Sequence, residues 1–391
     1  MQKIKNLKVV PNVIFAKGSI SELHQILSKK RSESGYAVFI IDHYFKNSSF
    51  EAKLQLQQND LCFYLDTTNE PTTAQVDEFV ENIMTQRQRA PDAIIGIGGG
   101  STMDVAKAVS IMLNNPGKAE IYQGWDLVKF PAVYKIGIPT ISGTGSEVSR
   151  TTVLIGPEKK QGINSDFSLF DQIILDPELL QTVPQHQRFY TGMDCYIHCV
   201  ESISGTFINE FSHAFASKAL NLCRDIFLKN GSDAELMVAS YFGGCSIVYS
   251  EVGVCHALSY GLSYLLGFHH GISNCIVFNH LDEYYPDYVP EFRKMLTKHK
   301  IKLPQKIEHN LTEQDLEKMI DVTLLMEKPL HNALGPNWRS RMTRDRIKEM
   351  YLKILGNEHD TGHNSSTWRQ QGHPTEKYQN NCRVPAHLLD C

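Results

Sequence analysis

The stretch IIGIGGGSTMDVAKA, residues 94–108, leads from an apolar, β-branched run through three consecutive glycines into a segment of helical composition. A strand, a glycine-rich turn and a helix in this order are typical of parallel α/β domains. Glycines let a diphosphate approach the backbone, and the unpaired N–H groups of a helix N-terminus attract its charge. The stretch therefore predicts an α/β domain with a phosphate site, although a tight turn without a ligand would also explain these residues.

A second turn of this kind follows another apolar run at IPTISGTGSEVS, residues 138–149. The first turn has neither the usual spacing of the dinucleotide fingerprint nor that of the P-loop. Two phosphate-compatible turns in one domain nevertheless favour a bound diphosphate. Asp42 ends an earlier run, VFIID, where a carboxylate would accept hydrogen bonds from a ribose diol and repel a 2′-phosphate. A helix-capping role explains Asp42 equally well.

The order of apolar runs predicts two domains. We expect strands at residues 37–42, 61–65, 93–97, 135–138 and 172–175, with helices at 73–88 and 102–113 between them. From about residue 178, long helical patterns replace the β-branched runs. The predicted organisation is a Rossmann-like, doubly wound α/β nucleotide-binding domain over residues 1–177, followed by an all-helical domain over 178–355. Residues 356–391 lack a hydrophobic period and are predicted to be a disordered tail.

The composition is typical of a soluble enzyme. The chain has 391 residues, 42% hydrophobic and 21% charged, with a net charge of −4 and no cluster of basic residues, which argues against a nucleic-acid partner. The N-terminal segment lacks a signal-peptide pattern, and the longest apolar run is too polar to span a bilayer. Nine cysteines without a CxxC pair indicate reduced thiols. We therefore expect a cytoplasmic protein with no membrane partner.

The stretch MDCYIHCVES, residues 193–202, places Asp194 and His198 one turn apart on one helical face. A buried Asp–His hydrogen bond would explain this pair alone. Downstream, His256 and the pair His269 and His270 lie in the apolar segment 254–274, where unpartnered imidazoles would be costly. One carboxylate and three imidazoles would form a site for a divalent cation, which would polarise a bound alcohol and lower its pKa. The four-residue set therefore predicts a metal centre for alcohol chemistry.

Taken together, these motifs make residues 1–355 resemble the iron-containing (group III) alcohol dehydrogenases. The shared features are GGGS with Asp104, PT-x-SGTGSE, a lysine sixteen residues before an Asp-Pro pair, G-x-D-x-x-x-H, and H-x13-H-G-x-x-N. The resemblance implies a dehydroquinate-synthase-like fold, with NAD bound to the α/β domain and one divalent metal in the helical domain. NAD is expected over NADP because of Asp42. The ligand chemistry accepts Fe²⁺, Zn²⁺ or Co²⁺ alike.

The resemblance also assigns roles to individual residues. The implied metal ligands are Asp194, His198, His256 and His270. The implied cofactor-binding residues are Asp42, Gly98, Gly99, Gly100, Ser101, Asp104, Thr140, Ser142, Thr144 and Lys160. One departure concerns proton transfer, because the family has a histidine near the nicotinamide where this chain has Tyr260. Either Tyr260 or His269 is expected to take part in the relay, and core packing is the alternative for Tyr260.

The run PTISGTGSEVSRTTVL, the segment NSDFSLFDQIILDP and Tyr260 resemble more narrowly the family members that oxidise the C8 hydroxyl of 3-deoxy-D-manno-octulosonate (Kdo), ahead of amination for lipopolysaccharide. A small sugar-acid substrate needs a cation several carbons from the reacting alcohol, and Arg150 and Arg188 are the candidates, each with a surface charge as its alternative role. The alternative functions are another polyol dehydrogenase, a dehydroquinate-synthase-like cyclase and a non-catalytic sensor. A homodimer is the default assembly.

Overall fold

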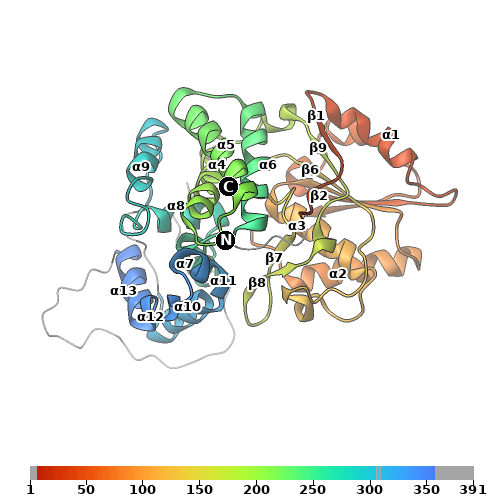
Figure 1. Cartoon of the computed structure of the whole chain (residues 1–391). Helices are drawn as coiled ribbons and strands as arrows, with labels where there is room; N and C mark the ends of the chain where they lie inside the picture. The colour runs from red at the N-terminus through yellow and green to blue at the C-terminus, as the bar shows by residue number, and fades with distance from the viewer. Residues whose placement is uncertain (1–6, 305–306, 308–309, 357–391) are drawn as a thin grey trace, which may run out of the picture.

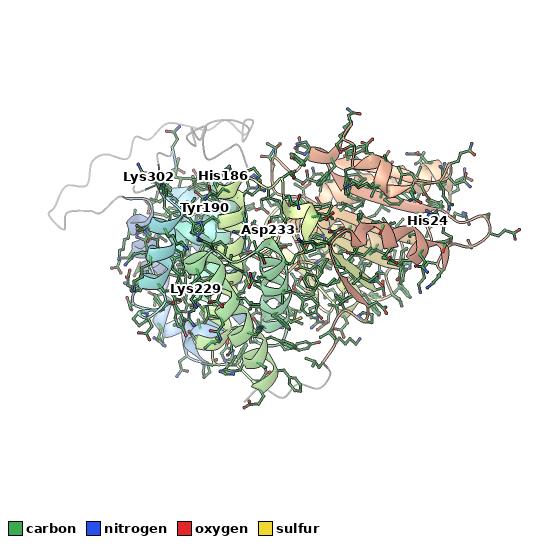
Figure 2. All side chains as sticks on the ribbon, turned by 90° about the horizontal axis from the view of Figure 1, so that it is seen from above. His24, His186, Tyr190, Lys229, Asp233 and Lys302 are labelled. Carbon is green, nitrogen blue, oxygen red and sulfur yellow. The ribbon has the colours of Figure 1, made fainter. Side chains whose placement is uncertain are left out.

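The fold is described from a computed structural model, which covers residues 7–304, 307 and 310–356. The predicted disordered tail lies, except for Gly356, outside the described residues. The chain forms an α/β half and a helical half that lie side by side (Figure 1). Seen from above, His24 belongs to the α/β half, and Tyr190 and Lys229 belong to the helical half (Figure 2).

A six-stranded parallel sheet forms the centre of the α/β half, in the order β1-β9-β6-β4-β2-β3. Its strands are β1 (Val13–Phe15), β2 (Ala37–Asp42), β3 (Leu61–Leu65), β4 (Ala93–Gly98), β6 (Lys135–Pro139) and β9 (Gln172–Leu175). All five predicted strands are therefore confirmed, with their ends placed to within one residue. The sequence prediction missed β1, a short edge strand whose two outer residues are exposed.

Helices cover both faces of this sheet, and this explains why its central strands are apolar throughout. All six residues of β2 are buried. Val38 and Ile40 pack with α2 (Thr73–Arg87) and α3 (Gly100–Met112), whereas Phe39 and Ile41 pack with α1 (Leu23–Ser28) on the opposite face. Both predicted helices, 73–88 and 102–113, are confirmed as α2 and α3.

The strand order reverses between β2 and β4. From β2 the chain moves outward to β3, and it then crosses back to form β4 on the other side of β2. Ligands of open α/β sheets bind in the crevice at such a switch point, beyond the carboxyl ends of the strands. Asp42 and the glycine turn after β4 stand at these two carboxyl ends. The topology therefore brings together two stretches that the sequence singled out separately.

A smaller three-stranded sheet, not predicted from the sequence, lies beside the first. It consists of β5 (Gly124–Trp125), β7 (Thr151–Ile155) and β8 (Lys160–Asn164), in the order β5-β8-β7. Strands β7 and β8 form an antiparallel pair. This hairpin carries Lys160, so it determines where one of the expected cofactor residues stands.

The described residues after β9 form no further strand. The helices are α4 (Gln185–Ser204), α5 (Glu210–Lys229), α6 (Asp233–Tyr249), α7 (Val254–Leu266), α8 (His270–Phe278), α9 (Val289–Lys298), α10 (Glu313–Leu325), α11 (Glu327–Leu334), α12 (Trp338–Arg341) and α13 (Arg344–Ile354). Their buried side chains share one large core. None of the helices in the described part of the chain has both the length and the apolar character needed to cross a bilayer.

The turn after β6 packs directly on the helical half. A Cβ atom at Gly143 would lie 1.7 Å from the carbonyl oxygen of Thr191 in α4, and one at Gly145 would lie 2.4 Å from the Cα of Gly244 in α6. The backbone N–H groups of Gly143 and Gly145 donate to Ser240 Oγ over 2.9 and 3.3 Å. These two glycines therefore allow the two halves to approach each other closely, a role that the phosphate interpretation of the turn did not include.

We expect Gly143→Ala to destabilise the protein by about 3 kcal/mol, because its methyl group would overlap backbone atoms that cannot rotate away. The matched control is Gly267→Ala, at a φ of +71° with nothing within 4 Å of the added Cβ. That control adds only left-handed strain, for which about 1 kcal/mol is expected. Chemical denaturation of both variants checks the difference. Equal losses of stability would show that close packing does not determine the choice of glycine at residue 143.

Candidate active site

Three helices bring four ligating side chains to one point. Asp194 and His198 come from α4, His256 from α7, and His270 from the first position of α8. Asp194 Oδ1 lies 3.5 Å from His198 Nε2, 3.3 Å from His256 Nε2 and 3.5 Å from His270 Nε2. One ligand atom from each residue lies within 4.8 Å of all the others. The structure therefore brings together the four residues that the sequence resemblance assigned to the metal.

The state of the donor atoms fits a divalent cation. Asp194 is fully buried, and its Oδ2 atom makes no hydrogen bond within the described residues. Burial lowers the pKa of His198 to about 4 and also lowers the pKa of His270, so both rings favour the neutral form that ligates metals. Burial opposes ionisation of Asp194, but the charges of the surrounding histidines keep its pKa well below the usual value. One carboxylate and neutral imidazoles suit Fe²⁺, Zn²⁺ or Co²⁺.

Glu201, which the sequence interpretation did not single out, fixes the orientation of His256. Its Oε2 atom lies 2.6 Å from His256 Nδ1 and accepts from Gly253 N over 2.8 Å. Its Oε1 atom accepts from Cys255 N over 2.6 Å and from the Tyr285 hydroxyl over 2.9 Å. A carboxylate that accepts from Nδ1–H leaves the Nε2 lone pair of His256 directed at the metal centre. Burial lowers the pKa of His256, but Glu201 and Asp194 outweigh it and raise that pKa to about 9, so a cation would displace a proton from Nε2 when it binds this ring.

Asn274, in α8, places an amide group among the ligand atoms. Its Nδ2 atom donates to Asp194 Oδ1 over 2.6 Å and lies 3.1 and 3.2 Å from the Nε2 atoms of His256 and His270. One atom of each of three candidate ligands thus lies close to a single electropositive group. Such convergence is what a cation site requires of its ligands.

A cavity of about 710 Å³ joins this centre to the two glycine-rich turns. His198, His256 and His270 line it from the helical half. Of the expected cofactor residues, those that line it are Asp42, Gly99, Gly100, Ser101, Asp104, Thr140, Thr144 and Lys160. Its volume lies in the range of small-molecule and cofactor sites. The candidate metal centre and the nucleotide turns therefore share one cavity.

Two of the expected cofactor residues lie elsewhere. Gly98 and Ser142 are not among the residues that line this cavity. Gly98 ends β4 and pairs with Pro139 of β6, so its backbone belongs to the sheet. Ser142 is buried and borders a small separate pocket with Arg188 and Leu236. The role of both in binding a nucleotide stays a prediction.

Asp42 and Asp104 line the cavity while also holding backbone in place. Asp42 Oδ1 accepts from Tyr44 N over 3.0 Å and caps the short helix after β2, while its Oδ2 accepts from Thr67. The capping alternative is therefore confirmed, alongside a position on the cavity wall. Asp104 accepts from Ser146 and from Val153 N, which ties α3 to the second turn.

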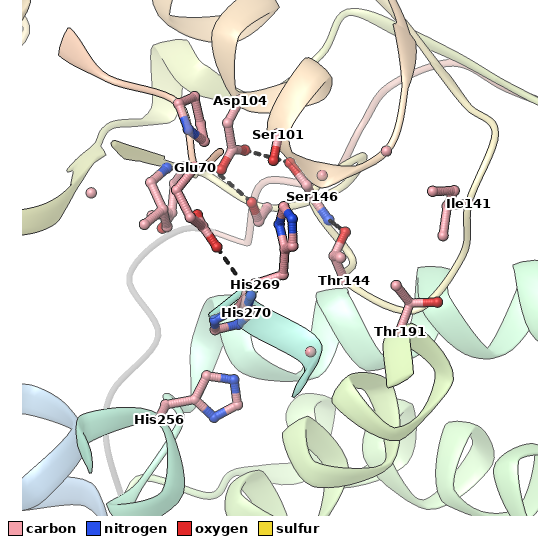
Figure 3. A pocket seen from close by; sticks show the side chains of 18 of the residues that line it. Glu70, Ser101, Asp104, Ile141, Thr144, Ser146, Thr191, His256, His269 and His270 are labelled. Atoms are coloured by element: carbon pink, nitrogen blue, oxygen red, sulfur yellow. Dashed lines mark hydrogen bonds between the residues drawn. The ribbon is translucent and has the colours of Figure 1, made fainter. Parts of the chain in front are cut away.

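Glu70 connects the two halves across the cavity. Its Oε1 atom accepts from the backbone N–H of His270 over 3.0 Å, and its Oε2 lies 3.4 Å from Lys160 Nζ. In Figure 3, Glu70 points toward the start of α8, with His269 and His270 beside it. Lys160 also stands 5.1 Å from the centre of the Tyr260 ring. No sequence signal pointed to Glu70, because it lies in a loop without a motif.

The two candidates for the proton relay both line the cavity. Tyr260 is nearly buried, and its ring centre lies 5.8 Å from that of His270. Burial raises the pKa of the Tyr260 phenol far above its usual value, so this group stays protonated and cannot act as a base. His269 stands at the N-terminus of α8 and lines the cavity. Of the two, His269 is therefore the better candidate to accept a proton.

Neither arginine proposed for the substrate carboxylate is free of carboxylate partners. Arg188 donates to Asp233 over 2.7 Å and does not line the large cavity. Arg150 lines the cavity but pairs with Asp126 and, over 3.2 Å, with Asp166. For Arg188, a role outside the substrate site is therefore favoured. The charge of Arg150 is largely neutralised by its two carboxylate partners.

Comparison with known families places these features in context. The profile for the iron-containing alcohol dehydrogenases matches residues 11–177, and the C-terminal profile of the same family matches residues 188–351. A sulfoacetaldehyde reductase of Bilophila wadsworthia is 34% identical over 192 residues, which are 46% of this chain and 49% of that reductase. The match thus spans about half of the reductase. An NAD-dependent methanol dehydrogenase of Bacillus methanolicus is 28% identical over 71% of this chain and 74% of its own length.

Solved structures show the same fold. An iron-containing alcohol dehydrogenase from Thermotoga maritima superposes with a TM-score of 0.75 at 24% identity, covering 90% of this chain and all of its own. A sulfoacetaldehyde reductase from Bifidobacterium kashiwanohense in complex with NAD⁺ gives a TM-score of 0.76 at 20% identity, covering 91% of this chain and all of its own. The two profiles together, and each of the two structures by itself, thus extend across the α/β and the helical half.

Proposed function

The chain belongs to the iron-containing alcohol dehydrogenase family, and we propose that it is an NAD- and divalent-metal-dependent dehydrogenase acting on the primary alcohol of a sugar acid. The observation that carries this proposal is the shared cavity, in which three of the four metal-ligating residues face the turns expected to bind the nucleotide. A hydride acceptor and a Lewis acid can act on one carbon only when both reach the same space.

In the reaction, the substrate alcohol loses a hydride from its carbon to NAD⁺ and a proton from its oxygen, giving the aldehyde. A cation held by Asp194, His198, His256 and His270 would lower the pKa of the alcohol. The protein supplies the remaining functions. Gly99, Gly100 and Ser101 offer the start of α3 to the diphosphate, and the hydroxyls of Thr140 and Thr144 face the same cavity. We assign proton transfer toward solvent to His269.

The best candidate substrate is 3-deoxy-D-manno-octulosonate, oxidised at C8. Support comes from the narrower sequence resemblance and from the replacement of the family histidine by Tyr260. The test incubates purified, metal-loaded enzyme with NAD⁺ and Kdo, traps the aldehyde and identifies it by mass spectrometry. NADH formation together with the trapped C8 aldehyde supports the proposal. Rapid oxidation of simple polyols with Kdo inert would leave a dehydrogenase of another substrate class.

A second candidate is reduction of a sulfonate-bearing aldehyde. It is favoured by the 34% identity to the Bilophila wadsworthia sulfoacetaldehyde reductase. Both candidates place an anionic group at the far end of the substrate. Two assays distinguish the candidate functions: oxidation of NADH with sulfoacetaldehyde, and reduction of NAD⁺ with Kdo. The better substrate is the one with the higher kcat/KM.

The position of Asp42 predicts the choice of cofactor. Its carboxylate stands at the carboxyl end of β2 and lines the cavity, so it would repel a 2′-phosphate. We expect wild-type enzyme to prefer NAD to NADP. Asp42→Ser should reduce that preference about tenfold, because it removes one repulsive contact between a carboxylate and the 2′-phosphate. The preference is the ratio of kcat/KM for the two cofactors. An unchanged ratio would mean that Asp42 serves only as a cap.

A further inference from the structure

One wall of the cavity carries a lysine that makes no direct contact with a carboxylate of any described residue. Lys328, in the first turn of α11, lines the cavity and makes neither an ion pair nor a hydrogen bond with any described residue. Its ammonium lies 3.0 Å from the centre of the Trp125 ring, which comes from β5 of the α/β half. The ring face attracts the cation without neutralising it. A positive charge thus remains available to a ligand at the border between the two halves.

A carboxyl group stands next to this lysine on the same wall. Glu251 lines the cavity just before α7, and its side chain accepts only from the neighbouring Val252 N, over 3.0 Å. Burial raises the pKa of Glu251 to about 7, although both Lys328 and His256 act to lower it. Glu251 therefore lies within electrostatic reach of both His256 and Lys328. Near neutral pH its carboxyl can both donate and accept hydrogen bonds.

The backbone of Glu251 has a strained conformation that its neighbours hold in place. Glu251 has a φ of +149°, a region that residues with a side chain rarely adopt. The side chain of Asn332, in α11, holds the segment by donating to the carbonyl oxygens of Glu251 and Val252 over 3.1 and 3.0 Å. Asn332 is one helical turn after Lys328, so the same face of α11 holds Glu251 and presents the lysine. The two charged groups are therefore positioned as a unit.

We propose that Lys328 and Glu251 form the subsite for the part of the substrate remote from the metal, with Lys328 binding its carboxylate and Glu251 its hydroxyl groups. This assignment rests on the proposed oxidation of a sugar acid. Glu251 and Lys328 line the same cavity as His256, so a substrate whose alcohol lies at the metal centre can extend its hydroxyl groups and its terminal acid toward them. Arg150, the earlier candidate, is already paired with two carboxylates, whereas Lys328 is paired with none that the structure describes.

The test compares steady-state kinetics of metal-loaded enzyme with NAD⁺ and three alcohols: Kdo, the uncharged polyol sorbitol, and 1-propanol. We expect Lys328→Met to raise the ratio of KM for Kdo to KM for sorbitol about 30-fold, the value of one charge-assisted hydrogen bond. Glu251→Ala should raise the ratios for both Kdo and sorbitol relative to 1-propanol, and Glu251→Gln should restore part of the loss. The control Lys118→Met, at an exposed position outside the cavity, should change none of these ratios.

The outcomes separate the two proposals. If wild-type enzyme oxidises sorbitol or 1-propanol but not Kdo, the sugar-acid function is wrong and the subsite falls with it. If wild-type enzyme oxidises Kdo and Lys328→Met leaves the Kdo-to-sorbitol ratio unchanged, the function stands and the subsite is wrong. Retained NAD⁺ affinity and an unaltered circular dichroism spectrum show that each variant is folded. A selective rise in the Kdo ratio supports the assignment.

Discussion

Replacement of Asp194 by alanine is expected to release the metal and to lower kcat at least about 1,000-fold, because Lewis-acid catalysis is worth several kcal/mol. Asp194 is the single anionic ligand, and its Oδ1 atom lies within 3.5 Å of an Nε2 atom of each of the three histidines. Metal content measured by mass spectrometry and kcat measured with saturating NAD⁺ check both parts of the result.

Asp194→Asn serves as the matched control, since it keeps the size of the side chain and one acceptor oxygen but removes the charge. It should also lose metal, while unfolding at nearly the same denaturant concentration as wild type. NAD⁺ affinity should persist in both variants, because the nucleotide turns belong to the α/β half. Full activity in a variant shown to be free of metal would contradict the assignment of this centre.

Glu201→Ala is expected to lower the free energy of unfolding by about 4 kcal/mol or more, because each orphaned buried donor costs at least about 1 kcal/mol. Four donors lose their acceptor: Gly253 N, Cys255 N, the Tyr285 hydroxyl and His256 Nδ1. Chemical denaturation measures the loss. A change below about 1 kcal/mol would show that the buried carboxylate is not needed for folding.

Glu201→Gln separates the effect on stability from the effect on the metal. Its amide oxygen can still accept from Cys255 N and Tyr285, but its amide N–H would face His256 Nδ1 and force the ring proton onto Nε2, the ligating atom. A smaller loss of stability is therefore expected, together with a 10- to 100-fold loss of metal affinity, the usual effect of removing such a partner. Wild-type metal affinity in this variant would mean that Glu201 does not set the tautomer.

The sheet was predictable because its central strands are buried on both faces and read as unbroken apolar runs, as in β2 and β4. The hairpin of β7 and β8 was missed because β8, with the sequence KQGIN, is mostly polar although all but one of its residues are buried. Length also hid β1 and β5, which have three and two residues.

The candidate metal ligands could be picked out from the sequence because four ionisable side chains stand in apolar segments. The sequence alone did not decide between His269 and His270, and the family resemblance was needed to choose His270. In the structure α8 begins at His270, and the ring of His270 lies beside Asp194. Glu201 gave a weak signal as a carboxylate in the apolar stretch 193–202. Lys328 gave none, since its importance comes from Trp125 and Glu251, which are distant from it in the sequence.

The contact of Glu70 with the start of α8 has a thermodynamic consequence. Its carboxylate joins a loop of the nucleotide half to the backbone of a metal-ligating histidine, and it pairs with Lys160 on the cavity wall. Any free energy by which a bound nucleotide tightens this contact must appear, with equal size, in the affinity for the cation. A nucleotide that tightened this contact would therefore raise the affinity for the cation, and the cation would raise the affinity for the nucleotide by the same factor.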